Sequence, residues 1–201
     1  MNPFGMDTFS SLAEVTVDVY TAAYRISGTV HTRFSRVAEI LNQQTGSHLT
    51  VEHATVSEYA DAMSTSGAPS ALGAIEEILV MIAPELDGAS GDEMRIPKRA
   101  VRAQLSIPPL RLTGAIHVPA GSRPVDGLLN VPDRFMPMTD ATLASGAYPE
   151  LVRSVAALAL RRDRAHVLLI ADDERPDELL ADVLDAPTAA AWLRSDEEAG
   201  V

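Results

Sequence analysis

The 201-residue sequence contains no cysteine, and its only lysine is Lys98. Without cysteine the chain has no disulfide, no thiol nucleophile and no thiolate-bound zinc or iron–sulfur site. A single lysine argues against Schiff-base chemistry. The absence of cysteine suits a cytoplasmic protein, because disulfides belong to oxidising compartments.

Long apolar runs are also missing, and the N-terminal residues do not predict a leader sequence. The longest apolar runs cover residues 78–83 and 167–171, far short of the roughly 20 residues that a membrane-spanning helix needs. The N-terminal residues show neither the basic region nor the apolar core of a signal peptide. We therefore expect a cytoplasmic protein with no membrane span.

Basic charge is scarce as well. The net charge is −12, and residues 172–201 alone hold ten acids and two arginines, a net of −8. This balance argues against a nucleic-acid partner, which needs a basic surface. The chain also lacks a Gly-x-Ser-x-Gly elbow, a phosphate-binding Gly-Lys loop and a dinucleotide fingerprint. We therefore predict no catalytic residue and no cofactor.

A repeated phrase is the most informative feature that is present. The sequence "YRISGTVH" (24–31) returns as "LRLTGAIH" (110–117), with Arg, Gly and His kept and the apolar letters exchanged for similar ones. Further blocks match in the same order: residues 37–42 with 125–130, 49–56 with 136–143, and 79–83 with 167–171. Chance similarity does not keep several blocks collinear. We predict a tandem duplication, with a degenerate first copy at 11–86, a second copy at 97–174 and an acidic helical tail at 175–201.

Each copy is predicted to be a small strand-helix-strand-strand unit. Alternation in "VTVDVY" indicates a half-buried strand, and Ala22–Ala23 or Pro108–Pro109 then bends the chain into a hairpin. A short helix follows, with Phe34, Val37, Ile40 and Leu41 on one face in the first copy. In the next strand the apolar phase slips by one residue, which predicts a β-bulge near His53 and near Asp140. A fully apolar last strand indicates a central position, covered on both faces.

The predicted fold class is therefore α+β, mainly β. Bends and bulges favour two curled sheets or partly open barrels, one per copy, plus a C-terminal helix. Residues 149–164 fit either a helix or a strand ending in the turn "RRDR", and we favour the strand.

The letters kept in both copies are the candidate site residues. In a strand, Tyr24, Ile26, Gly28 and Val30 share the core face, so Arg25 and His31, like Arg111 and His117, point away from it. Three interpretations stay open for these four residues: local hydrogen bonds, a contact with the other copy or a subunit in which Arg pairs with carboxylates, and a ligand site. No histidine has metal-ligand spacing, although His117 with Asp140 and His31 with His53 are imaginable pairs, and we predict no metal.

Two further segments supply candidates. The loop "PAGSRPVDG" (119–127) is rich in Pro and Gly and contains Arg123, and Ser122 can cap the helix that starts at Pro124. The tail begins as a helix at Pro176, and Trp192 lies near its end. That helix either packs on its own copy or docks on a partner, for which a Trp is a frequent anchor.

The second copy resembles a family of short bacterial domains of unknown function. The pattern runs through Arg111, Gly114, Ile116, His117, Pro119, Gly121, Arg123, Asp126, Leu129 and Asn130, and then through "F-x-P-x-T-D-A" at 135–141. The match covers about a third of the chain, from Leu110 to Ala171. It implies a fold and a lineage but no chemistry.

These observations predict a non-catalytic assembly or adaptor subunit that binds a protein partner or forms a homo-oligomer. One alternative is a small-molecule-sensing module with the ligand held between the copies near Arg111, His117 and Asp140. Another is a hydrolase whose site carries no recognisable motif.

Overall fold

A computed structural model of the protein describes residues 12–61, 63–86, 97–129 and 132–170. Its N-terminal half, residues 13–82, holds five strands and the short helix α1 (Val37–Asn42). The strands are β1 (Ala13–Tyr20), β2 (Tyr24–Thr32), β3 (His48–Glu58), β4 (Thr65–Ala74) and β5 (Val80–Ile82). The 3₁₀ turn η1 (Ile75–Glu77) joins β4 to β5, and η2 (Pro84–Leu86) follows β5.

The C-terminal half, residues 98–170, has the same order of elements. Its strands are β6 (Lys98–Ile107), β7 (Leu110–Pro119), β8 (Phe135–Ser145), β9 (Arg153–Arg161) and β10 (Val167–Ile170). The helix α2 (Pro124–Leu129) lies between β7 and β8, and the 3₁₀ turn η3 (Arg162–Arg164) lies between β9 and β10. The strand favoured for 149–164 is confirmed as β9, and η3 is the turn at its end.

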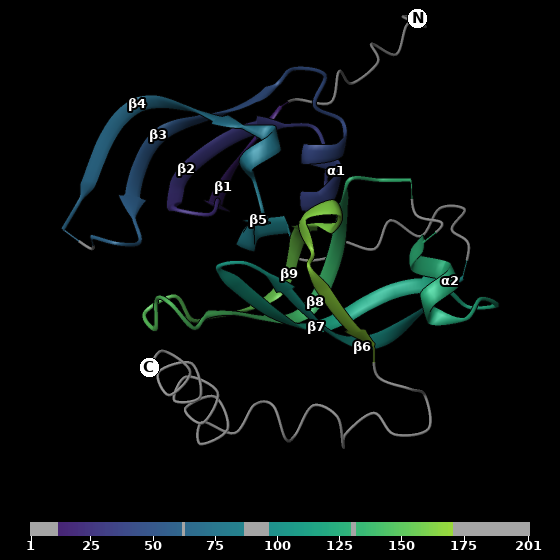
Figure 1. Ribbon diagram of the computed structural model, residues 1–201. Helices are drawn as coiled ribbons and strands as arrows, with labels where there is room; N and C mark the ends of the chain where they lie inside the picture. The colour runs from purple at the N-terminus through teal and green to yellow at the C-terminus, as the bar shows by residue number, and fades with distance from the viewer. Residues whose placement is uncertain (1–11, 62, 87–96, 130–131, 171–201) are drawn as a thin grey trace, which may run out of the picture.

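All ten strands of the described residues belong to one antiparallel sheet, in the order β10-β6-β7-β8-β9-β5-β1-β2-β3-β4. Figure 1 shows the N-terminal half above the C-terminal half, with β5 between them. The mainly β class is confirmed. The prediction of two separate sheets is wrong, because β5 of one half pairs with β9 of the other.

The two halves share their strand registers. In the first hairpin Tyr20 lies opposite Arg25 and Glu14 opposite His31; in the second Ser106 lies opposite Arg111 and Ala100 opposite His117. The kept Arg and His thus occupy matching strand positions in the two halves.

Both predicted bulges are confirmed. The ladder between β2 and β3 shifts register between Ser27 and Thr29, and the ladder between β7 and β8 shifts between Thr113 and Ala115. The extra residues are His53 and Asp140, whose φ angles are 50° and 47°. Each bulge sets one residue in the left-handed region and turns the apolar phase of its strand over.

The predicted helix of the first copy is confirmed as α1, which buries Val37, Ala38, Ile40 and Leu41. The second helix, α2, begins at Pro124 as expected, since a first-turn proline loses no helical hydrogen bond. The Ser122 hydroxyl donates to the carbonyl oxygen of Pro119 at 2.9 Å.

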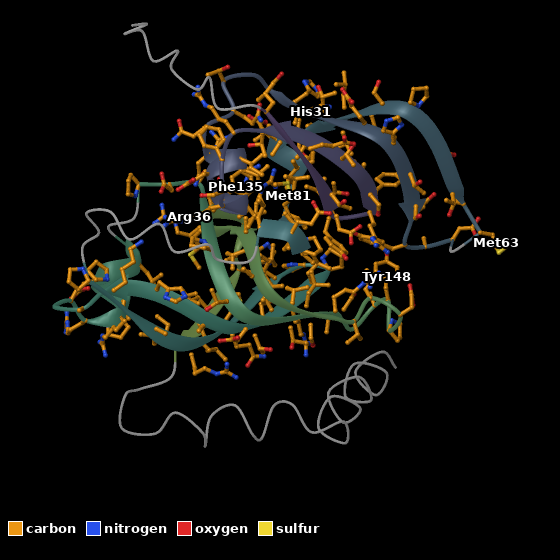
Figure 2. All side chains as sticks on the ribbon, turned by 180° about the vertical axis from the view of Figure 1, so that it is seen from behind. His31, Arg36, Met63, Met81, Phe135 and Tyr148 are labelled. Carbon is orange, nitrogen blue, oxygen red and sulfur yellow. The ribbon has the colours of Figure 1, made fainter. Side chains whose placement is uncertain are left out.

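Two hydrophobic cores meet at β5. Val80 and Ile82 pack into the core of the C-terminal half, whereas Met81 packs into that of the N-terminal half. Successive side chains of a strand point to opposite faces, so the two cores lie on opposite faces of the sheet at this strand. Figure 2 shows Met81 and Phe135, both members of the N-terminal core, at the centre of the molecule.

Three sequence-based expectations need correction. Tyr24, predicted on the core face, is exposed. The last strand of the second copy, predicted to be central, is the edge strand β10, with alternate side chains exposed. The sequence match also set Val80 beside Leu168, but Tyr20 lies opposite Val80 and Ser106 opposite Val167. Val167 is therefore the counterpart of Val80, a slip of one residue that exchanges the two faces of the strand.

The predicted tail helix, with Trp192, lies outside the described residues. Within the described part of the chain, no helix has the length and apolar character needed to cross a membrane.

Candidate functional site

The candidate residues of the N-terminal half are engaged in local contacts on β1 to β3. The Arg25 guanidinium donates to both carboxylate oxygens of Asp18, at 2.8 and 2.9 Å, and Ser27 donates to the same carboxylate. His31 Nε2 lies 3.1 Å from the Glu52 carboxylate at an exposed position. These contacts agree with the first of the three interpretations, local hydrogen bonding, because both carboxylates belong to the same half as Arg25 and His31.

The corresponding residues of the C-terminal half have different surroundings. Gln104 stands where Asp18 stands in the first hairpin, and the Arg111 side chain is exposed. His117 Nε2 lies 2.9 Å from the Thr139 hydroxyl. Burial lowers the pKa of the His117 imidazole below its ordinary value; the positive charge of Lys98 adds to this shift and the carboxylate of Asp140 opposes it.

The remaining candidates do not extend this group. Arg123 is exposed and donates to Asp126, in the first turn of α2, at 2.8 Å. Arg111 and His117 lie on β7 and Asp140 on β8, whereas the two halves join at β5 and β9. The structure therefore does not bring Arg111, His117 and Asp140 to the place where the halves meet.

Metal-ligating side chains and a hollow are the next features of the described segments that bear on a site. Over residues 12–61, 63–86, 97–129 and 132–170, no group of three or more His, Asp or Glu side chains is arranged to hold a metal ion. A hollow of about 290 Å³ lies beside α1, lined by Leu41, Asn42, Gln44, Gly46, Ile75, Pro132, Asp133 and Arg134. Its lining includes one arginine and one aspartate and no histidine.

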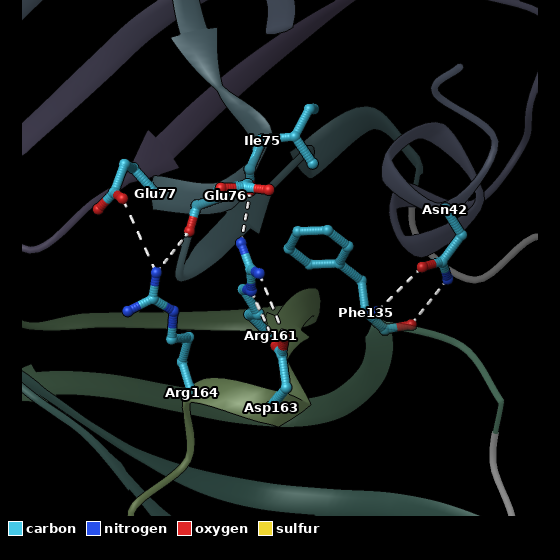
Figure 3. Close-up of polar contacts among 8 residues, drawn as sticks. All are labelled: Asn42, Ile75, Glu76, Glu77, Phe135, Arg161, Asp163 and Arg164. Carbon is cyan, nitrogen blue, oxygen red and sulfur yellow. Dashed lines mark hydrogen bonds and ion pairs between the residues drawn. The ribbon is translucent and has the colours of Figure 1, made fainter. Parts of the chain in front are cut away.

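Polar side chains also connect the two halves at their junction. Arg161, at the end of β9, is 5% exposed. It donates to the carbonyl oxygen of Ile75 at 2.8 Å and to both carboxylate oxygens of Asp163, as Figure 3 shows. These hydrogen bonds lower the pKa of the Asp163 carboxyl below its ordinary value. Arg161 thus satisfies a backbone carbonyl of the N-terminal half from a side chain of the C-terminal half.

Two more side chains, Asn42 and Arg164, make contacts across the same junction (Figure 3). The Asn42 amide donates to Phe135 O at 2.8 Å and accepts from Phe135 N at 2.9 Å, so it pairs with the first residue of β8 as a neighbouring strand does. Arg164 donates to Glu76 O at 3.2 Å, and a second contact joins it to the Glu77 carboxylate at 3.7 Å. Sequence reasoning did not identify these residues, although Asn42 lies in a repeated block and "RRDR" was noted as a turn.

The two ends of the sheet are the other feature that sequence reasoning missed. Among the described residues β4 pairs only with β3, and β10 only with β6. Both edge strands present large apolar side chains to solvent: Leu72 is 67% exposed, Val167 51% and Leu169 54%. Exposed apolar groups on an unpaired strand are typical of a surface that binds another strand.

Comparisons with known proteins give no guide to the site: no family model, no curated protein and no solved structure matches the chain. The resemblance of the second copy to short bacterial domains stays a prediction.

Proposed function

We propose that this chain is a non-catalytic assembly or adaptor subunit of the cytoplasm, which binds a protein partner along the open edge of its sheet at β4. The observation that carries the proposal is the exposure of this strand. Its first six residues, 65–70, are all exposed, and no other described strand pairs with its outer edge.

An open strand of this kind favours recognition by strand addition. Backbone groups on the outer edge supply the affinity, and alternate side chains supply the specificity. The side chains of β4 are mostly Gly, Ala and Ser, which leave the backbone accessible. Pro69 removes one backbone donor near the middle of the strand, so we expect a partner strand to pair with residues 70–74.

The two halves are, in this proposal, copies of one duplicated unit. Matching registers around Arg25 and Arg111 support the duplication, as do the bulges at His53 and Asp140. A duplicated unit that joins its own copy through a strand edge has a surface already suited to protein–protein contact.

Site-specific photo-crosslinking tests the proposal. A benzophenone amino acid replaces Ser70 or Leu72 on β4 in the full chain, and Gln43 or Ala147, both exposed, in the controls. We expect covalent protein adducts from the β4 positions and not from the controls. We also expect Leu72→Lys to reduce the adduct formed from position 70, while Val152→Lys, at an exposed apolar residue away from β4, leaves it unchanged. Adducts that are equal at all positions, or absent from β4, would overturn the proposal.

A further inference from the structure

Inside the molecule, the two halves join where the outer edge of β9 pairs with the outer edge of β5. In the N-terminal half the strand that corresponds to β9 is β4, and in the C-terminal half the strand that corresponds to β5 is β10. These two strands are the open ends of the sheet. The edges that meet once inside the chain are therefore presented a second time at the two ends of the sheet, where no other described strand pairs with them.

The register of β10 matches that of β5, but the side chains of β10 are not covered as those of β5 are. Leu79 N–H donates to Tyr20 O at 2.8 Å, and His166 N–H donates to Ser106 O at 2.9 Å, which sets β5 and β10 in the same position beside their hairpins. Val167 then stands where Val80 stands, and Leu169 where Ile82 stands. Val80 and Ile82 are 0% and 2% exposed, whereas their counterparts are about half exposed.

The register of β4 gives the complementary picture. Arg161 lies opposite the first residue of β8 and Ala74 opposite the first residue of β3, so Ala74, Gly73 and Leu72 are the counterparts of Arg161, Leu160 and Ala159. Ala159 is 0% exposed at the junction, while Leu72 on β4 is 67% exposed.

We infer that β10 of one copy of this chain adds to β4 of a second copy, in the register in which β5 adds to β9. Val80 lies opposite Leu160 and Met81 opposite Ala159, so Val167 of one copy lies opposite Gly73 of the next, and Leu168 opposite Leu72. This inference rests on the proposed function and names the partner of the β4 edge. The contact joins two different surfaces, so repetition gives a ring or an open filament and not a two-fold dimer.

Charges at the strand ends favour this partner. The turn after β4 carries Glu76 and Glu77, and the turn before β10 carries Arg162 and Arg164. Arg164 already lies 3.7 Å from Glu77 at the internal junction. Each copy keeps its own contact between Arg164 and Glu77, so between copies the acidic turn η1 and the basic turn η3 add the attraction of opposite charges and no second pair of this kind.

The contact between copies is weaker than the junction within the chain. Ala74 replaces Arg161, whose guanidinium donates to Ile75 O, so the strongest polar contact of the internal junction has no counterpart between copies. We therefore expect a reversible association that depends on protein concentration.

Cysteine cross-linking tests the inference, because the chain has no cysteine of its own. Leu72→Cys and Leu168→Cys variants of the full chain are mixed, one of them labelled with ¹⁵N, and treated with a short bismaleimide. These two positions lie directly opposite each other in the inferred register, on the same face of the sheet. We expect the adduct that joins position 72 to position 168 to exceed both adducts between identical positions. The double variant Leu72→Cys/Leu168→Cys should give a ladder of multimers.

A second measurement uses charge in place of cysteine. Val167→Lys should weaken self-association about tenfold, because one apolar side chain no longer becomes buried. Val125→Lys, at a valine of similar exposure on α2, should leave association unchanged. Sedimentation velocity over a range of protein concentrations measures both variants.

The possible outcomes separate this inference from the proposed function. Adducts mainly between identical positions show a two-fold dimer, and the absence of any adduct shows that no second copy binds; either result overturns the inference. If β4 still forms photo-adducts with a different protein, the proposed function stands without self-assembly. If neither β4 nor β10 forms an adduct of any kind, both fail.

Discussion

Gly28 and Gly114 lie at the register shifts of β2 and β7, beside the bulges of the neighbouring strands. A Cβ atom on Gly28 would meet the backbone oxygen of Glu52, and one on Gly114 would lie 2.8 Å from Thr139 O. Both obstacles are backbone atoms, which cannot move without disturbing the bulge. We predict that Gly28→Ala and Gly114→Ala each lower the free energy of unfolding by about 2 kcal/mol or more.

Gly67 is the matched control for this prediction, because a Cβ atom there meets nothing within 4 Å. Gly67→Ala should change stability by less than about 0.5 kcal/mol. Urea denaturation of the three variants measures the difference, and equal losses at all three positions would contradict the prediction.

His117 is the residue through which pH should act on stability. Its pKa in the folded protein is lowered, chiefly by burial and then by Lys98. The unfolded chain therefore binds the proton more readily, and stability falls as pH drops through the ordinary histidine pKa of about 6.5 towards the lowered value. His117→Gln should remove this part of the pH dependence between about pH 7 and 5.

The measurement is the free energy of unfolding at several pH values for the wild type, His117→Gln and the control His53→Gln, at an exposed histidine. The curve of His117→Gln should be the flatter one. Identical slopes for all three proteins would show that protonation of His117 is not coupled to folding.

Among the elements, β5 and β10 are corresponding strands of the two halves that lie in different environments. Val80 of β5 is covered by the core of the C-terminal half, and Val167, at the same register position of β10, is half exposed. We predict that Val80→Lys lowers the free energy of unfolding by more than about 3 kcal/mol, since it buries a charge without a partner.

Val167→Lys, in contrast, should change the stability of the dilute monomer by less than about 0.5 kcal/mol. Chemical denaturation at low protein concentration, where copies do not associate, compares the two. A large loss from Val167→Lys in the monomer would show that another part of the same chain covers β10.

At the scale of the whole molecule, the two halves should unfold together. Met81, Phe135 and Ala159 come from β5, β8 and β9 and share the N-terminal core, while Tyr20 and Tyr59 pack into the C-terminal one. Neither core is complete without residues of the other half. We predict one cooperative transition, in which the slowest-exchanging amides of β1 and β7 open with the same free energy.

Native-state hydrogen exchange followed by mass spectrometry measures these opening energies. Val80→Lys should lower both of them together, because β5 belongs to both cores. If the amides of β7 kept their protection while those of β1 lost it, the halves would be independent domains.

Much of this organisation could be predicted from local sequence. Alternation of apolar residues identified β1, β2 and β7, the phase slips located the bulges at His53 and Asp140, and the helical spacing located α1. These features depend on backbone geometry and on side chains close in sequence. The candidate residues Arg25 and His31 were likewise placed on the correct face of β2, although their partners Asp18 and Glu52 were not identified.

What the sequence determined by itself is therefore the first hairpins, the helix α1, the positions of the bulges and the two matching registers, because strand periodicity and turn residues act over a few positions. The predicted strand-helix-strand-strand order is incomplete, since it contains no strand for β4, whose residues are mostly Gly, Ala and Ser. Only the tertiary structure decided which of the two apolar last strands, β5 or β10, is paired on both sides. The apolar segments 79–83 and 167–171 look alike as sequence, yet β5 is buried between β1 and β9 while β10 ends the sheet. The burial of a strand depends on which other elements pack against it, and the order of apolar residues along the strand does not show which elements these are. For the same reason, the sequence does not predict that the buried Arg161 donates to the carbonyl oxygen of Ile75, which is far away along the chain.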